Sequence, residues 1–599
     1  MGIHVDYLAE ERAALIRAQE DCSQQAWSAV RRVCEDHCDD LTHRGERMLS
    51  MPWWSFLAMR SPLASVLQQR GLSLRVSEVA RSLLQEARRR EDEYAEAERR
   101  TWSEQQVRDG LERVGFARRL LPYQIRNVCL LASLPAAATF SVPGSGKTTE
   151  ALATYFLTRA DADRLLVIAP KNAFMAWEEE LPQCMPTAGF DIARLTGGSE
   201  RVRATLAGDP VATIITYHQL QYVIDDILRC ITDHPTHLVV DESHRMKRGT
   251  SGVFASCILR MAHIARRKLI LSGTPMPNAV IDLVAQFQFL YPEIPVTEED
   301  VIERVRSIYT RTTKSELGLP TPIRTRIPVP MSPGQERLYR ALQSDAARRV
   351  EGLRVRDRLR FRAFARCILH MIQAASNPAL LAHSDIAGHE LLQDALADGV
   401  APKIQEASRI AREQARQGRK TVIWSAFVQN VEHVAALLGD LGAEFVHGGV
   451  GTSEDDGALD SREAKIRRFN DPESDCMVLV ANPAACSEGI SLHRICHHAV
   501  YLDRTFNAAH YLQSEDRIHR IGLSPEQNTY ISRLHAPDSI DDVVEQRLDV
   551  KVARMGEVLN DPDLNIQALD LDSVDEDELP GGFDPEDFGA VRQMLLGGR

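Results

Sequence analysis

Apolar and polar positions follow two different periods along this chain. Residues 11–37 and 76–114 carry apolar side chains at helical spacing among many charges. From about residue 116 the pattern changes to short apolar runs, each followed by a polar or glycine-bearing loop. We therefore expect a helical N-terminal domain over residues 1–115 and α/β structure after it.

The short runs fall into two sets with helical segments between their members. Strands are expected at the start of the runs 136–148, 164–172, 211–219, 237–244 and 268–275, and again in 420–427, 443–449, 476–484, 498–504 and 528–536. Such alternation is typical of doubly wound parallel sheets, whose ligands gather at the carboxyl ends of the strands. We expect two such lobes, over residues 116–295 and 385–558.

The remaining segments read differently. Between residues 296 and 384 strands are expected to stop, and arginine-rich helical sequence suggests a helical insert between the lobes. Residues 559–599 are acidic and punctuated by Pro and Gly, which predicts a mobile tail with a disordered end.

Composition narrows the class of protein without defining it. The 599 residues are 44% hydrophobic and 26% charged, with no apolar run of membrane-spanning length and no signal-peptide pattern, so a cytoplasmic protein with no membrane partner is expected. The eleven cysteines include no C-x-x-C pair, which argues against a disulfide framework or a zinc ribbon. At a net charge of −13, binding to nucleic acid would need a local basic channel.

A phosphate-binding loop is indicated after the first strand of the first set. The residues "GSGKTT" lie between that strand and a predicted helix, where backbone N–H groups can surround phosphate oxygens. Lys147 would reach the β- and γ-phosphates, and the Thr148 hydroxyl would bind Mg²⁺. The predicted nucleotide-binding residues are Gly144, Ser145, Gly146, Lys147, Thr148 and Thr149.

An acidic pair and two late arginines complete the expected chemistry. Asp241 and Glu242 follow a strand, where the first can hold Mg²⁺ and the second can orient the attacking water, although such a pair also caps helices. Gln513, Arg517 and Arg520 share one face of a predicted helix, which alone would suit a solvated surface. With a phosphate loop upstream, the two arginines are better explained as groups that stabilise charge on the γ-phosphate.

In this order the motifs resemble helicase superfamily two and, within it, the Swi/Snf family of DNA-translocating ATPases. The similarity runs from about residue 119 to 558 and includes "LLPYQIRNVCLL", "LVIAPKNAFMAWEEEL", "DESH", "LSGTPMPN" and "QSEDRIHRIG". It implies two RecA-like lobes with ATP and Mg²⁺ as cofactors. It also implies adenine contact by Gln124, coupling of hydrolysis to lobe movement by His244, Ser272, Thr274 and Gln513, and a DNA track lined by Lys171, Thr216, Gly489 and Ser491.

Lysine is rare, which draws attention to the positions that keep it. Only nine of the 71 basic residues are lysines, and four of them fall inside the motifs: Lys147, Lys171, Lys314 and Lys403. A compact ammonium group that arginine cannot replace is expected at such positions.

The resemblance predicts an ATP-driven translocase on double-stranded DNA that remodels or clears DNA-bound complexes. We expect a bacterial protein, with a role as motor subunit of a defence system and a protein partner bound through the N-terminal domain or the acidic tail. Two alternatives remain: a strand-separating DNA or RNA helicase, and a nucleotide-gated scaffold with little turnover.

Overall fold

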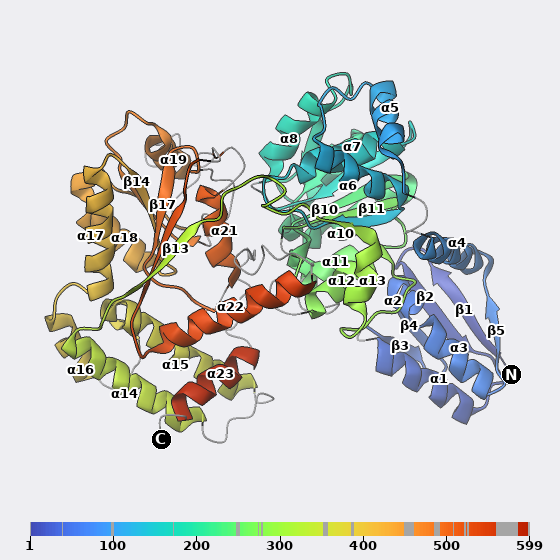
Figure 1. Cartoon of the computed structure of the whole chain (residues 1–599). Coiled ribbons are helices and arrows are strands. Elements are labelled where there is room, and N and C mark those ends of the chain that lie inside the picture. The colour runs from blue at the N-terminus through green and yellow to red at the C-terminus, as the bar shows by residue number, and fades with distance from the viewer. Residues whose placement is uncertain are drawn as a thin grey trace. The chain divides into compact units, whose positions relative to one another are not determined.

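A computed structural model represents the chain (Figure 1). It describes residues 2–38, 40–96, 101–171, 173–246, 252–273, 275–276, 280–350, 358–384, 389–448, 461–483, 492–506, 508–519, 523, 526–558 and 585–596. The chain divides into two compact units, Met1–Thr312 and Thr313–Arg599. Among the described residues, no helix is long and apolar enough to cross a membrane.

The N-terminal region of the first unit contains a five-stranded mixed sheet, so the expectation of a purely helical domain is wrong. Its strand order is β3-β4-β2-β1-β5. The strands are β1 (Gly2–Leu8), β2 (Ala13–Ala18), β3 (Thr42–Gly45), β4 (Met48–Pro52) and β5 (Ser73–Val76), and the helices are α1 (Gln24–His37), α2 (Trp53–Ala58), α3 (Arg60–Gln69) and α4 (Glu78–Ala95).

Pairing between β1 and β2 explains why periodicity misled there. Antiparallel pairing places Val5 opposite Ile16 in a core that also holds Trp27, so residues spaced as on a helix become part of a sheet. Apolar runs this short fit a strand and a buried helix equally well. The helical prediction is confirmed where the pattern is longer, in α1 and α4.

The rest of the first unit is built on a seven-stranded sheet whose pairings are all parallel, as predicted. Its order is β12-β6-β11-β10-β7-β9-β8. The strands are β6 (Ala136–Thr139), β7 (Arg164–Ile168), β8 (Ile192–Leu195), β9 (Ala212–Ile215), β10 (Thr236–Asp241), β11 (Arg267–Leu271) and β12 (Tyr309–Thr310). The helices are α5 (Glu104–Val114), α6 (Pro122–Ser133), α7 (Lys147–Thr158), α8 (Ala173–Cys184), α9 (Ser199–Ala207), α10 (Tyr217–Asp233), α11 (Val253–Leu259), α12 (Ile281–Leu290) and α13 (Val301–Val305).

The second unit is built on a six-stranded sheet, again with only parallel pairings. Its order is β13-β18-β17-β14-β16-β15. The strands are β13 (Ile323–Pro328), β14 (Lys420–Trp424), β15 (Glu444–Val446), β16 (Val478–Ala481), β17 (Cys496–Tyr501) and β18 (Tyr530–His535). The helices are α14 (Pro333–Val350), α15 (Arg358–Ser376), α16 (His389–Ala397), α17 (Pro402–Arg416), α18 (Val428–Leu437), α19 (Arg462–Asn470), α21 (Ala508–Ile518), α22 (Ile540–Val558) and α23 (Pro585–Leu596).

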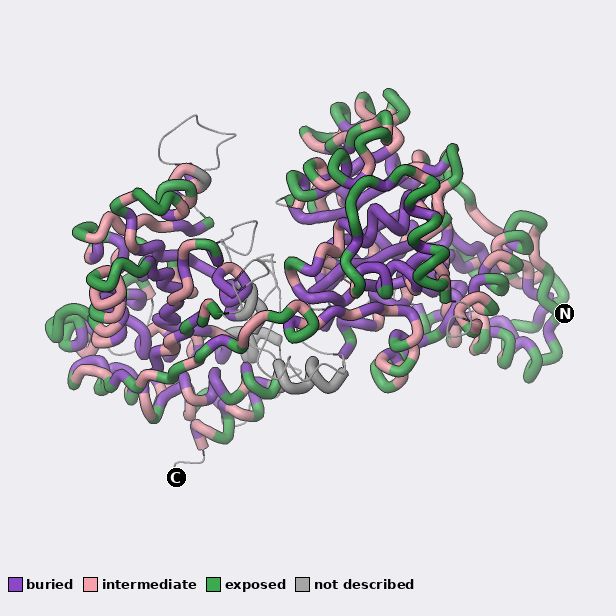
Figure 2. The backbone as a smooth tube through the Cα atoms, turned by 45° about the horizontal axis from the view of Figure 1, so that its top comes forward, coloured by how far each residue is buried: buried purple, intermediate pink, exposed green. Residues whose placement is uncertain are grey.

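In both units buried stretches lie toward the interior and exposed stretches toward the outside (Figure 2), and the central strands β6, β7, β10, β14 and β16 are almost wholly buried. Strands buried on both faces read as continuous apolar runs, which is why most of them could be predicted.

Two expectations for the connecting and terminal segments are wrong. Strands do not stop between residues 296 and 384: β12 adds to an edge of the first sheet and β13 to an edge of the second. The charged sequence of β13 hid it, since an edge strand tolerates the exposed Arg326, and Arg324 pairs with Glu515. At the end of the chain, α23 packs on α14 and α22, with Phe588 meeting Phe364 at 5.5 Å between ring centroids. The acidic residues 559–584 lie outside the described residues.

Candidate active site

The phosphate loop spans the end of β6 and the start of α7. Gly144 and Gly146 both have φ of 86°, in the left-handed region that glycine adopts at little cost. A Cβ at Gly146 would lie 2.3 Å from Gln124 Nε2, so a side chain here would displace the Gln124 amide in addition to being strained at this φ. Because α7 begins at Lys147, the loop presents its amides at the positive end of a 12-residue helix.

Lys147 folds back over its own loop. Its Nζ donates to the carbonyl oxygens of Ser141 at 2.9 Å and Val142 at 3.5 Å. These acceptors are neutral, and phosphate oxygens form stronger, charge-assisted bonds. The Ser145 hydroxyl is buried without a hydrogen-bond partner among the described residues. The loop therefore has a cation and a donor that a triphosphate could engage.

Gln124 contacts the phosphate loop from α6. Its Oε1 accepts from Leu121 N at 2.9 Å, and its Nε2 donates to Ser145 O at 3.1 Å, as does the Tyr123 hydroxyl at the same distance. The side chain is buried, and it links the start of α6 to the loop. Its contact with adenine stays a prediction.

The acidic pair lies at the end of β10, close to the loop. Trp177 Nε1 donates to Asp241 Oδ2 at 2.9 Å, and Glu242 N donates to Asp241 Oδ1 at 3.0 Å. Burial raises the pKa of Asp241 above its ordinary value, and the hydrogen bond from Trp177 and the charge of Lys147 oppose that shift. The carboxylate is thus held in place and lies within the field of Lys147.

His244 connects the acidic pair to the neighbouring strand. Its Nδ1 lies 3.4 Å from Glu242 Oε2 and 3.2 Å from Ser272 Oγ, which follows β11. The histidine thus links the ends of the adjacent, parallel strands β10 and β11, and its role in coupling stays a prediction. Thr274, the other coupling residue predicted here, lies outside the described residues.

The described residues fit a magnesium–nucleotide complex. Asp241 and Thr148 are the only protein groups we predict as Mg²⁺ ligands, and within the described ranges no group of three or more His, Cys, Asp or Glu residues could hold a metal. Mg²⁺ commonly binds through one or two protein ligands together with substrate phosphates and water. Binding of Mg²⁺ by these two residues stays a prediction.

The structure describes only part of the late motif, which belongs to the second unit. Arg517 lies on α21, half-buried, and its carbonyl oxygen accepts from Leu492 N at 2.9 Å. Gln513 also lies on α21, but its side chain is outside the description. Arg520, Gly489 and Ser491 fall wholly outside the described residues.

The two DNA-track residues of the first unit lie just beyond strand ends. Lys171 is exposed after β7, and Thr216, after β9, caps α10 by accepting from Gln219 N at 3.0 Å. Both follow carboxyl ends of the same sheet, as a common track requires. Contact with DNA stays a prediction.

Sequence reasoning missed a buried network behind the phosphate loop. Glu150 on α7 accepts from Asn127 Nδ2 at 2.8 Å and from Thr139 Oγ1 at 3.2 Å. Asn127 Nδ2 also donates to Thr312 Oγ1 at 3.0 Å. Glu150 lies three residues after Lys147 in the predicted helix. This helical spacing was the signal from which its position facing the sheet could have been predicted.

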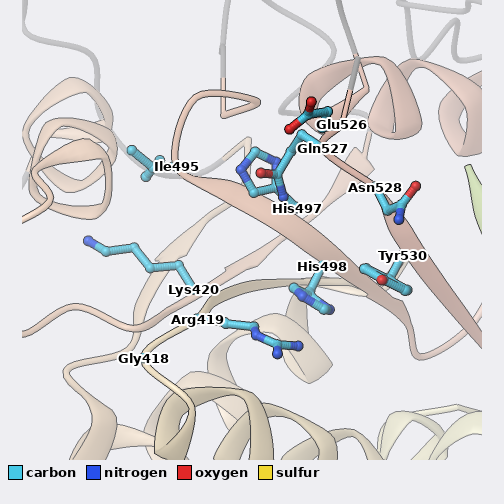
Figure 3. Close-up of a pocket in the computed structure, with 10 residues that line it drawn as sticks. All are labelled: Gly418, Arg419, Lys420, Ile495, His497, His498, Glu526, Gln527, Asn528 and Tyr530. Carbon is cyan, nitrogen blue, oxygen red and sulfur yellow. The ribbon is translucent and has the colours of Figure 1, made fainter. Parts of the chain in front are cut away.

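A separate cavity of about 410 Å³ opens in the second unit at the amino ends of β14, β17 and β18 (Figure 3). His498 stacks on Tyr530 there, with ring centroids 4.9 Å apart, and burial lowers the pKa of His498 to about 4. Ligands of parallel sheets bind at the carboxyl ends, so we do not place the active site in this cavity.

Two family models match the chain. Residues 123–380 match the SNF2-related domain, and residues 402–522 match the helicase conserved C-terminal domain. The first match contains the phosphate loop and the acidic pair, and the second contains Arg517 and Arg520.

Curated relatives show the same similarity at low identity. The chain is 25% identical to the Drosophila melanogaster protein "ATP-dependent helicase brm" over 76% of this chain and 28% of that protein. It is 24% identical to "ISWI chromatin-remodeling complex ATPase ISW1" of Saccharomyces cerevisiae over 72% of this chain and 40% of that protein. An "Uncharacterized ATP-dependent helicase" of the bacterium Mycoplasma pneumoniae is 23% identical over 67% of this chain and 38% of its own length. The chain therefore spans well under half of these relatives.

Proposed function

Because this chain belongs to the Swi/Snf family of helicase-related ATPases, we propose that it hydrolyses ATP to drive translocation along double-stranded DNA. The observation that supports this most directly is the convergence of Lys147, the Asp241–Glu242 pair, His244 and Ser272 at the carboxyl edge of one parallel sheet.

Each group has a proposed role in phosphoryl transfer. Lys147 leaves the Ser141 and Val142 carbonyls to bind the β- and γ-phosphates, and Thr148 and Asp241 hold Mg²⁺, which neutralises phosphate charge when bound. Glu242 orients water for attack on the γ-phosphorus, and the bond from that phosphorus to the bridging oxygen breaks, leaving ADP and phosphate. Arg517 and Arg520 stabilise the charge that develops on the γ-phosphoryl oxygens.

Movement along DNA would rest on phosphate contacts rather than on base reading. We assign these contacts to Lys171, Thr216, Gly489 and Ser491. His244 and Ser272 would transmit hydrolysis, with Thr274 and Gln513, to movement of the lobes. Translocation of this kind would remodel or clear complexes bound to the duplex.

ATP turnover by the purified chain, alone and with duplex DNA, single-stranded DNA or RNA, tests this function. We expect duplex DNA to stimulate turnover at least tenfold, and Lys147→Ala and Arg520→Ala to abolish the stimulated rate. Arg409→Ala, which removes an exposed ion pair with Glu406 on α17, is the matched control and should keep it.

Other outcomes would point to the alternatives. Stimulation only by single strands or RNA would favour a strand-separating helicase, and nucleotide binding without turnover would favour a nucleotide-gated scaffold.

The biological setting forms a separate part of the proposal. A bacterial origin is supported by the Mycoplasma relative, and we propose that the motor works in a defence system with a protein partner on the N-terminal domain or the acidic tail. A host strain carrying Lys147→Ala should then lose protection against phage in a plaque assay, and equal plating of both strains would reject this role.

A further inference from the structure

The segment of residues 311–322 that joins β12 to β13, here called the connector, and the start of β13 contact helix α21, which carries Arg517. Glu515 accepts two hydrogen bonds from the Arg324 guanidinium, from Nε at 3.2 Å and Nη2 at 2.6 Å. Asp516, the next residue, pairs with Lys314 Nζ. One turn later, His519 Nε2 donates to Pro320 O at 2.6 Å. Lys314 and Pro320 lie on the connector, and Arg324 lies at the start of β13.

These contacts are buried and fix the rotation of the helix. Lys314, Glu515 and Asp516 are each at most 4% exposed. Although burial alone would raise the pKa of Glu515, the Arg324 guanidinium lowers it below its ordinary value, so the pair is ionic. Adjacent residues point about 100° apart around a helix axis, so two neighbouring pairs resist rotation in both directions. Arg517 follows directly, and its direction depends on that rotation.

The other end of the connector is hydrogen-bonded to the phosphate loop. In the first unit, Thr312 N donates to Ser141 Oγ at 3.0 Å, and Thr312 O accepts from Val142 N at 3.1 Å. Ser141 and Val142 are the residues whose carbonyls hold Lys147. Thr312 and Lys314 are two residues apart, so their Cα atoms are at most about 7 Å apart along the chain.

We propose that residues 312–314 couple the phosphate loop directly to α21, and that Lys314 and Arg324 are positioning residues that orient Arg517 for phosphoryl transfer. This inference rests on the proposed ATPase function. When Lys147 turns from the loop carbonyls to phosphate, the loop's hold on Thr312 changes, and the Lys314–Asp516 pair carries that displacement to the helix.

Kinetics of single and double variants separate positioning from a structural role. We expect Lys314→Met to lower kcat for ATP about tenfold with KM within twofold, because nucleotide binding stays with the first unit. In an Arg517→Ala background the same change should cost no further kcat, since Lys314 acts through that arginine. Arg409→Met is the control. A loss of equal size in both backgrounds would overturn the inference.

Arg324→Lys is a milder second variant that tests the same inference if Lys314→Met fails to fold. It keeps Glu515 paired with a charge but loses the second hydrogen bond, and we expect a loss of kcat of about threefold that is likewise absent beside Arg517→Ala.

Hydrogen exchange tests the coupling without requiring turnover. With a non-hydrolysable ATP analogue, exchange should slow in peptides from α7 and α21 of the unmodified chain, but only in α7 for Lys314→Met. If exchange in α21 slowed equally in both proteins, or if exchange slowed only in α7 of the unmodified chain, the proposed coupling through the connector would be wrong. Failure of DNA to stimulate turnover would reject the translocase without deciding this result.

Discussion

At the scale of single residues, Glu242 shows how the site is prepared. Its φ of 52° lies in the left-handed region, which is strained for a residue with a side chain. The Tyr217 hydroxyl donates to Asp241 O at 2.6 Å and to Glu242 O at 3.1 Å and so stabilises this turn. The surrounding contacts maintain this strained backbone conformation, in which the carboxylate of Glu242 faces His244. In regular strand geometry the side chain would point in another direction.

Glu242→Gln should separate binding from chemistry. The amide keeps the size of the side chain but replaces one carboxylate oxygen by a donor and removes the charge that orients the water, so we expect kcat to fall at least about 100-fold while ATP still binds with similar affinity. Steady-state turnover and binding of a fluorescent ATP analogue measure the two effects. Asp225→Asn, an exposed carboxylate-to-amide change in the same unit, is the control. Equal loss of binding and turnover would contradict the assigned role.

Glu150 predicts a pH dependence of stability. Burial raises its pKa from 4.5 to about 7, against the hydrogen bonds from Asn127 and Thr139. Between these two pH values the folded chain retains a proton that the unfolded chain has released. The free energy of unfolding should therefore fall as pH rises through this window, by on the order of 3 kcal/mol in total, and stay level above it.

Denaturant unfolding of Glu150→Gln across pH 4.5–8 checks this assignment. The neutral amide cannot titrate, so the variant should lack this part of the decline and be more stable than the unmodified chain above pH 7. Parallel pH profiles of the two proteins would show that Glu150 does not carry the proton.

At the scale of helices and strands, prediction succeeded where an apolar run was long enough to form a buried strand and was followed by motif residues. The buried strands β6, β7 and β10 are continuous apolar runs followed by motif residues, so element and site were found together. It failed for β12 and β13, which are very short or exposed and gain their structure from a neighbouring strand. Contacts between distant segments, such as Lys314 with Asp516, leave no periodic trace. The scarcity of lysine singled out Lys314 and Lys403, and both are buried beside an aspartate.

Helix α23 offers a prediction at this scale. Phe588 is buried beside Phe364, and Asp587 is fully buried in an ion pair with Arg547 at 2.8 Å. Phe588→Ala should release the helix, because loss of a buried aromatic side chain costs about 3 kcal/mol or more. Limited proteolysis should then cleave within residues 585–596 faster, whereas the exposed change Gln593→Ala should leave the rate unaltered. Unchanged cleavage of Phe588→Ala would mean that other contacts hold α23.

At the scale of the whole molecule, charge opposes the proposed ligand. A net charge of −13 repels duplex DNA, and acidic residues are concentrated at 575–578, where four follow one another. A dense cluster produces a stronger local field than the same charges spread over a surface. The cluster should therefore weaken DNA binding more than its share of the total charge.

Neutralising this cluster tests the point, and a second variant with the same net charge controls for it. The test changes are Asp575→Asn, Glu576→Gln, Asp577→Asn and Glu578→Gln. The control changes, each at an exposed position, are Glu10→Gln, Glu20→Gln, Glu298→Gln and Glu299→Gln. We expect the first variant to bind duplex DNA severalfold more tightly than the second at 0.05 M salt. The difference should shrink at 0.15 M, where screening acts within about 8 Å. Equal affinities at both salt concentrations would show that only total charge matters, and that residues 575–578 have no special effect on access to DNA.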